Sequence, residues 1–237
     1  MRLVVIGTSH ISPESVKRIE QTIREQDVQA VAIELDAQRL ASLFNQETKS
    51  DWRMIRKVGL QGYIFALIGS YVQKKLAKHI GMQPGDDMRA AVRAARKQHI
   101  PLELIDQPIY ITLRRISQVF TWREKLRVFA DVVRAALFPK RELKKRGLEQ
   151  FDLKKVPSKD VIAKLIKDLR ERYPSLYKVL IEERNQYMVR KLREIAPKYD
   201  GLVVVVVGAG HEEGMLELLK QHTKKQSSSQ HSKMPER

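Results

Sequence analysis

The sequence predicts an α/β protein with a mostly parallel central sheet, covering helices, and a long helical insertion between the last two strands. Two observations carry this prediction. Three short segments are dominated by Val, Ile and Leu rather than alternating between apolar and polar residues, as expected of strands that helices cover on both faces. These segments are residues 3–6, 28–35 and 202–207. Helical patterns separate them, and such alternation of strand and helix is typical of an α/β domain.

The first helix is predicted directly after the first strand. Ser12 is placed to cap it and Pro13 occupies its first turn, while Val16, Ile19 and Ile23 supply one apolar face. Residues 88–97 form the next predicted helix of this kind, and they precede a weaker strand at residues 101–105. A last helix, residues 212–221, follows the final strand.

The long middle of the chain, about residues 108–198, contains no convincing strand. Amphipathic patterns recur there, and three prolines divide the segment into several helices. We interpret it as a helical insertion packed on the sheet, within one domain of residues 1–222. Residues 223–237 are rich in Ser, Gln and Lys and are predicted to be a disordered polar tail.

The chain is strongly basic, with 45 Lys+Arg against 28 Asp+Glu and a formal net charge of +17. Residues 114–172 alone carry 18 Lys/Arg and 8 Asp/Glu. Solvated helix faces are the plain explanation, and an anionic membrane surface or an acidic partner are the alternatives. Nucleic acid is disfavoured as a partner, because this segment lacks aromatic interleaving, helix-turn-helix spacing and an RNP-type strand.

Composition and hydropathy exclude several other classes. The chain has no Cys, which rules out disulfide frameworks, cysteine zinc sites and thiol catalysis and is compatible with the cytoplasm, where we place the protein. We expect no signal peptide at the N-terminus, because its apolar run is too short. The longest uncharged stretch, residues 58–73, is shorter than the ~20 apolar residues that span a bilayer. We predict a buried helix there, with membrane-surface contact as the alternative.

Two segments at opposite ends of the chain share one pattern: an apolar strand, then Gly-x-x-His, then a helix. They end in His10 and His211. Ligands of open α/β sheets bind beyond the carboxyl ends of the strands, glycine lets the backbone approach a ligand closely, and a neutral imidazole is a common metal ligand. A single histidine of this kind would more often be structural. The repetition favours a functional site.

Acidic residues follow two other predicted strands. Glu34 ends the second strand, where a parallel sheet would place it on the same edge as His10, and it is the better candidate ligand. Asp36 fits a helix N-cap. Asp106 is similarly placed after the weaker strand but fits a cap as well. Further on, Glu183 and Arg184 are adjacent on a helix, where they point about 100° apart, and a surface ion-pair network explains them equally well.

These residues resemble a known family. The motif series, in chain order, is GTSHISPES, VAIELDAQR, PGDDMRAA, LIDQPIYITLRR, ERNQYM and VVGAGHEEGM. The series is similar to that of the TraB/PrgY family, which groups with the Tiki metalloproteases and the erythromycin-esterase/ChaN-like proteins. The similarity covers about residues 2–219. Bacterial relatives are implicated in shutting down peptide sex-pheromone activity, and the Tiki relatives are metal-dependent proteases.

The resemblance implies a role for nine residues. His10, His211 and Glu34 would hold a divalent metal, for which the family favours Mn or Co and the ligand types also allow Zn or Fe. Glu183 would accept a proton from water, and Arg184 or Arg39 would bind an oxyanion or a peptide carboxylate. Asp106, Arg114 and Asp87 match further motif positions, which we assign to substrate binding.

Two departures from the family pattern matter. Asp87 stands where relatives usually carry Glu, which shortens the carboxylate by one methylene. Many archaeal relatives continue into transmembrane helices, whereas this sequence continues into a polar tail, so membrane anchoring is not carried over. The leading expectation is a metal-dependent hydrolase acting on peptides. The rival is a non-catalytic, peptide-binding or membrane-associated regulatory protein that works through its basic helical surface.

Overall fold

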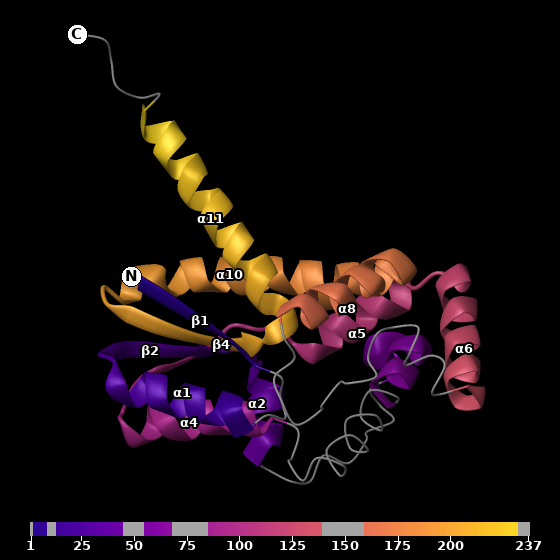
Figure 1. The fold of residues 1–237 in the computed structure, drawn as a ribbon, viewed down its shortest axis with the longest axis horizontal. Coiled ribbons are helices and arrows are strands. Elements are labelled where there is room, and N and C mark those ends of the chain that lie inside the picture. Colours follow the sequence, from indigo (N-terminus) through magenta and orange to yellow (C-terminus); the bar gives the residue numbers. More distant parts are fainter. Residues whose placement is uncertain (1, 9–12, 45–54, 68–84, 139–158, 232–237) are drawn as a thin grey trace.

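The computed structural model describes residues 2–8, 13–44, 55–67, 85–138 and 159–231 (Figure 1). Their centre is a four-stranded, entirely parallel sheet with the strand order β1-β4-β2-β3. The strands are β1 (Arg2–Thr8), β2 (Val28–Ile33), β3 (Leu102–Leu104) and β4 (Leu202–Gly208). The predicted α/β class and parallel sheet are confirmed.

Helices make up most of the remaining described chain. Those that alternate with the strands are α1 (Pro13–Glu25), α2 (Ala37–Phe44), α4 (Asp86–Lys97) and α11 (Ala209–His231). Those between β3 and β4 are α5 (Ile109–Val119), α6 (Trp122–Leu137), α8 (Lys159–Arg172), α9 (Pro174–Tyr177), a π-helical turn (Lys178–Glu182), α10 (Glu183–Ile195) and a 3₁₀ turn (Ala196–Lys198). Residues 55–67 are also helical.

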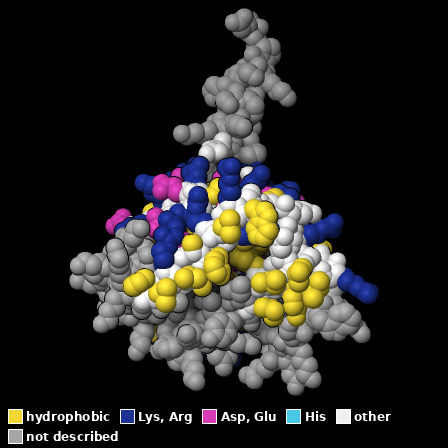
Figure 2. All heavy atoms as spheres, turned by 90° about the vertical axis from the view of Figure 1, so that its right-hand side faces the viewer, with side chains coloured by type: hydrophobic (Ala, Val, Ile, Leu, Met, Phe, Trp, Pro, Cys, Tyr) yellow, Lys and Arg dark blue, Asp and Glu magenta, His cyan; other side chains and the backbone are white. Residues whose placement is uncertain are grey.

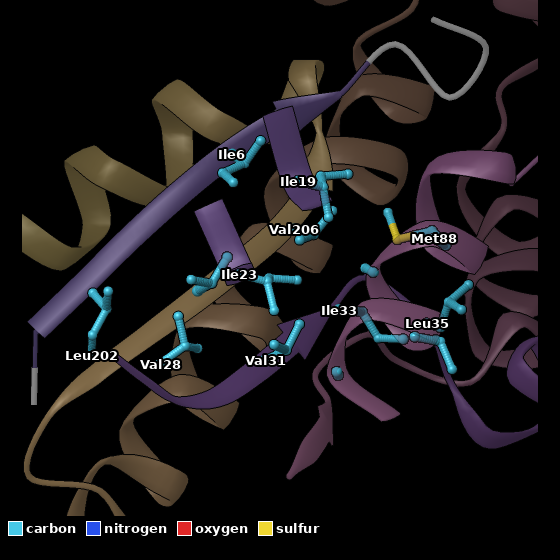
Figure 3. Packing of buried hydrophobic residues seen from close by; sticks show 14 residues of the cluster. Ile6, Ile19, Ile23, Val28, Val31, Ile33, Leu35, Met88, Leu202 and Val206 are labelled. Atoms are coloured by element: carbon cyan, nitrogen blue, oxygen red, sulfur yellow. The ribbon is translucent and has the colours of Figure 1, made fainter. Parts of the chain in front are cut away.

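Helices cover the sheet on both faces, which explains the valine run of β4. Val204 and Val206 pack with residues of α1 and α4, including Ile19 and Met88 (Figure 3). Val203, Val205 and Val207 belong to a second core with residues of α10 and α11. Since both sides of the strand are buried in apolar side chains, every position favours a β-branched hydrophobic residue.

The helical insertion between the last two strands is confirmed where the structure describes it, because residues 109–138 and 159–198 contain helices and no strand. Its basic cluster around Lys144 lies outside the described residues. Ser12, the predicted cap of the first helix, also lies outside them. Helix α11 continues to His231, past the predicted end at residue 221.

The long uncharged stretch is only partly buried. Its described part lies in the helix of residues 55–67, whose Val58 is buried and whose Gly62 N–H donates to Ser117 Oγ of α5 at 2.6 Å. Leu60 and Ile64 on the same helix are exposed, contrary to the buried helix that hydropathy predicts. Among the described residues, no helix combines the length and hydropathy needed to cross a membrane.

Candidate active site at the carboxyl edge of the sheet

The strand order places the candidate site residues at one edge. β1, β4 and β2 are neighbours and run parallel, so their carboxyl ends meet, with Thr8 opposite Gly208 and Ile33 opposite Val206. Glu34 directly follows β2, and His211 lies in the first turn of α11. Glu34 therefore lies on the edge of the sheet where β1 ends. His10 itself follows β1 by two residues and lies outside the described residues.

The guanidinium of Arg184 joins these strand ends. One of its amino groups, Nη2, donates to Glu34 Oε1 and, at 2.8 Å, to Asp106 Oδ2. Its Nε donates to Asp106 Oδ1 at 3.1 Å, so that Asp106 binds the guanidinium with both oxygens. The other amino group, Nη1, lies 3.0 Å from Nε2 of His211. The structure thus brings together four of the predicted site residues around one positive charge.

Arg184 is held in its charged form by this environment. Burial opposes the charge, but the carboxylates of Glu34 and Asp106 outweigh burial and raise the pKa of the guanidinium above its ordinary value. Both carboxylate side chains are almost completely buried. The remaining oxygen of Glu34, Oε2, accepts the Gly208 N–H at 2.6 Å. Glu34 therefore links the ends of β2 and β4 as well as binding the arginine.

Hydrogen bonds fix the tautomer of His211. A guanidinium has no acceptor, so Nε2 of His211 must present its lone pair to Arg184. The proton of a neutral imidazole then lies on Nδ1, which donates to Asn185 Oδ1 at 2.7 Å. Helices α10 and α11 approach each other closely at this point: a Cβ on Gly214 would lie only 2.4 Å from Asn185 Nδ2. The absence of a Cβ at Gly214 thus leaves room for the Asn185 amide that contacts His211.

A π-helical turn, Lys178–Glu182, immediately precedes the residues of this network on α10. Such turns are rare, and they occur frequently at functional sites. Glu183 and Arg184 follow it directly, and Asn185 completes the segment that contacts the edge of the sheet.

Asp106 orients two arginines. In addition to Arg184, it accepts a hydrogen bond from Nη1 of Arg39 at 2.6 Å. Arg39 is in turn placed by Asp36, whose Oδ1 accepts the N–H groups of Gln38 and Arg39 and whose Oδ2 accepts the N–H of Ile109 at 3.1 Å. Asp36 is therefore the N-cap that the sequence predicts. Asp106 is buried behind the arginines, an arrangement that favours a positioning role over direct contact with a substrate.

Two of the other predicted residues, Asp87 and Arg114, lie outside the Arg184 network. Asp87 is completely buried at the start of α4 and accepts a hydrogen bond from the Thr8 hydroxyl at the end of β1. The shorter carboxylate thus reaches the edge of the sheet. Arg114 is exposed and lines a surface depression beside Tyr110 and Ser117, away from the Arg184 network.

Glu183 points to a different partner from Arg184. Its two oxygens accept hydrogen bonds from Nη2 and Nε of Arg115, on α5, at 2.7 and 3.1 Å. This ion pair raises the pKa of Arg115, first through the hydrogen bond and then through the charge of Glu183. Adjacent residues on a helix diverge by about 100°, which explains why Glu183 and Arg184 face different neighbours.

The donor atoms suit a metal ion in part. Glu34 Oε1 and His211 Nε2 are 3.5 Å apart, close to the ~3.4 Å that separates two ligands of a tetrahedral ion bound at ~2.1 Å. Asn185 supplies the second hydrogen bond that metal-binding histidines usually make. However, both donor atoms face Arg184. Within the described ranges, no three His, Asp or Glu side chains form a group that could hold an ion.

Sequence reasoning assigned no role to Asn185, Arg115 or Thr8. The signal for Asn185 was its place in the Glu-Arg-Asn run. Arg115 directly follows Arg114, and only Arg114 was assigned to substrate binding. Thr8 lies inside the first Gly-x-x-His motif, between the glycine and the histidine. No spacing in the sequence indicates that Thr8 and Asp87 pair, because they lie on different elements.

Comparison with known proteins supports the family that the motif series of the sequence resembles. The model of the TraB/PrgY/gumN family matches residues 2–227. An uncharacterized protein of Methanocaldococcus jannaschii is 34% identical over 221 residues, which cover 92% of this chain and 53% of that protein. The human TraB domain-containing protein is 24% identical over 240 residues, covering 90% of this chain and 61% of its own length. The chain thus spans less than two thirds of these relatives. It belongs to the TraB/PrgY/gumN family.

Proposed function

We propose that the edge around Arg184 is the active site of a metal-dependent hydrolase acting on peptides, in which His211, Glu34 and His10 hold the ion. One observation carries the proposal. Glu34 Oε1 and His211 Nε2 are 3.5 Å apart at the carboxyl ends of neighbouring parallel strands, and the third neighbour, β1, leads into His10. Mn or Co is the expected metal, with Zn or Fe as alternatives.

A bound divalent ion would lower the pKa of a water molecule and polarise a peptide carbonyl. The protein contributes the orientation of the ligands. Asn185 holds the proton of His211 on Nδ1, so that Nε2 keeps its lone pair. The Gly208 N–H holds Oε2 of Glu34 and leaves Oε1 facing His211. Both ligands would therefore need little rearrangement.

Arg184 has two roles in this proposal. In the structure it occupies the donor atoms of Glu34 and His211, so that metal binding requires it to leave both. Asp106 also binds the guanidinium, through Nε and through Nη2, the amino group that Glu34 shares. Arg184 can then remain at the site on Asp106 and direct Nη1 toward the negative charge that develops on a peptide carbonyl.

Glu183 is the proposed proton acceptor. Its oxygens are bound to Arg115 in the structure, so Arg115 must release it before it can accept a proton from water. That ion pair is half exposed, and exposed pairs contribute only ~0–1 kcal/mol. The exchange is therefore energetically accessible.

A groove beside the second Gly-x-x-His motif supports a peptide as the substrate. It lies between α8 and α11, has a volume of about 330 Å³ and extends to Ala209, two residues before His211. Among the described residues that line the groove, carboxylates dominate the polar ones: Asp160, Glu212, Glu213 and Glu217, with Lys220 as the basic residue. This charge favours peptides with basic side chains.

Metal calorimetry tests the site. Protein freed of metal should bind Mn²⁺ or Co²⁺ near 1:1, and His211→Ala and His10→Ala should each abolish binding. His99→Ala serves as the matched control, because His99 is an exposed histidine that precedes β3 and so lies at the opposite edge of the sheet. Unchanged binding in both histidine variants would refute the metal site. Cleavage of a peptide library by the Mn²⁺-loaded protein tests turnover separately, and basic peptides should be cleaved fastest.

One observation favours a second candidate, a non-catalytic peptide-binding protein. Arg184 satisfies Glu34, Asp106 and His211 together, so the described network is complete as a structural element. Glu183→Gln separates the two functions. If the protein is an enzyme, this variant should lose turnover and keep peptide affinity. A wild-type protein that binds metal and peptides but cleaves nothing would favour the binding protein.

A further inference from the structure

Helix α6 presents its apolar side to solvent. Trp122, Leu126 and Phe129 are 75%, 66% and 68% exposed, and Leu137 is 66% exposed. These residues and Val133 recur at intervals of three or four and occupy one stripe of the helix, since each residue advances by about 100°. A surface helix of a globular protein normally turns such a stripe inward. Here the stripe faces outward.

The opposite side of α6 buries its carboxylates against the protein. Glu124 Oε1 accepts the Ser175 N–H at the start of α9 at 2.8 Å, and its other oxygen completes a capping box with Thr121. Asp131, about two turns on, accepts hydrogen bonds from Arg172 and Tyr173. Both acidic residues are buried. The orientation of α6 is therefore fixed by polar contacts, and the outward stripe is its consequence.

The exposed surface of α6 is basic as well as apolar. Arg123 and Lys125 flank the stripe on opposite sides, and Lys125 Nζ lies 4.9 Å from the centre of the Trp122 ring. Glu124 and Asp131 are turned inward, where Asp131 is paired with Arg172 and Arg134, so neither carboxylate lies beside these charges. Figure 2 shows this end of the molecule, where hydrophobic side chains gather in a band with Lys and Arg beside it.

We propose that α6 docks on an anionic lipid bilayer. A stripe of Trp, Leu and Phe with basic residues beside it is the composition of helices that lie in the membrane interface, with the apolar side chains among the acyl chains and the cations at the headgroups. A second copy of the chain fits less well. Two such faces in contact would bring the Arg123 and Lys125 side chains of both copies together, and like charges oppose that contact.

Trp122 is a built-in probe of this contact. The chain has two tryptophans, Trp52 and Trp122, so a Trp52→Phe background isolates the emission of Trp122. Adding vesicles of phosphatidylcholine with 30% phosphatidylglycerol (about a third anionic lipid, chosen for a strong surface potential) should shift that emission to the blue. Brominated lipids should quench it. Vesicles of phosphatidylcholine alone should produce a weaker response.

Sedimentation with the same vesicles measures binding by the full-length protein. Leu126→Asp/Phe129→Asp should reduce the bound fraction at least ~tenfold, because two large apolar groups are replaced by anions. Leu165→Asp on α8 is the matched control: Leu165 is an exposed leucine, 39% exposed, that lies off α6. It should bind like the wild type. Arg123→Gln/Lys125→Gln should weaken binding mainly at low salt, since salt screens surface charges.

Three results would overturn the proposal. One is the absence of binding to anionic vesicles by correctly folded wild-type protein. Another is binding that Leu126→Asp/Phe129→Asp leaves unchanged while the circular dichroism spectrum stays native. The third is a stable dimer in sedimentation equilibrium that this double variant dissociates, without vesicle binding by the wild type. That result would assign α6 to contact between copies of the chain.

Discussion

Replacing Arg184 with Gln should destabilise the protein severely. The substitution removes the positive charge between Glu34 and Asp106 and leaves a shorter, uncharged polar side chain. Removing one partner of a buried ion pair costs ~3–5 kcal/mol, because the other charge stays buried without compensation. Two contacts soften this loss: Arg39 still binds Asp106, and the Gly208 N–H still binds Glu34. We therefore expect a loss near the lower limit, ~3 kcal/mol.

Urea denaturation followed by circular dichroism measures this loss. Domains of this kind are stable by only ~5–15 kcal/mol, so a loss of 3 kcal/mol should move the midpoint visibly. Arg115→Gln is the matched control. It also removes an arginine from a carboxylate, but Arg115 is 37% exposed and its pair should be worth no more than ~1 kcal/mol. Equal losses in the two variants would refute the central role of Arg184.

The same variant tests whether Arg184 competes with a metal. In the wild type, an ion must displace the guanidinium from Glu34 Oε1 and His211 Nε2. In Arg184→Gln those atoms lack their cation, so Mn²⁺ should bind more tightly and restore stability. At 100 times its dissociation constant, an ion that binds only the folded state adds ~2.7 kcal/mol. If Mn²⁺ stabilised the wild type more than the variant, the proposed competition between Arg184 and the metal would be refuted.

Three further predictions concern the contacts around the site and α6. Gly214→Ala should lower the free energy of unfolding by ~1–3 kcal/mol and disturb His211, because the new methyl group would lie 2.4 Å from Asn185 Nδ2. Urea denaturation measures this loss, and unchanged stability would contradict the prediction. Asn185→Ala should lower metal affinity about 10–100-fold by calorimetry, and equal affinity would deny its orienting role. Asp131→Asn should destabilise by ~1–2 kcal/mol at pH 7. Burial alone would raise the pKa of Asp131, but hydrogen bonds from Tyr173 and Arg172 outweigh burial and lower this pKa. The difference in unfolding free energy between wild type and Asp131→Asn should therefore shrink as pH falls below about 3.8. A difference that stays constant with pH would contradict this.

The fold was largely predictable because burial leaves a direct signature in composition. Strands buried on both faces must be apolar at nearly every position, and the Val run of β4 shows this along residues 203–207. The parallel direction followed from the alternation with helices. The strand order did not follow. Which strand lies between β1 and β2 depends on how the insertion returns the chain to the sheet, and local sequence carries no signal for that.

The site was predictable as a set of residues but not as an arrangement. Strand ends and glycines indicated Glu34 and His211, and a parallel sheet brings such positions together. The place of Arg184 depends on how α10 packs across the sheet. One-residue steps on a helix decide which of two adjacent side chains enters the site, and neither composition nor spacing shows that Arg184 enters while Glu183 turns to Arg115.

Helix α5 connects the two surfaces that carry the proposals. It begins at Ile109, whose N–H binds Asp36 beside the Arg184 network, and it leads at its other end into α6. Arg115, midway along α5, binds Glu183 next to Arg184. A helix of this length, Ile109–Val119, extends only ~16 Å at 1.5 Å per residue. A displacement of α6 on a bilayer would therefore act on α5 directly and would move Arg115, which must release Glu183 before that carboxylate can accept a proton.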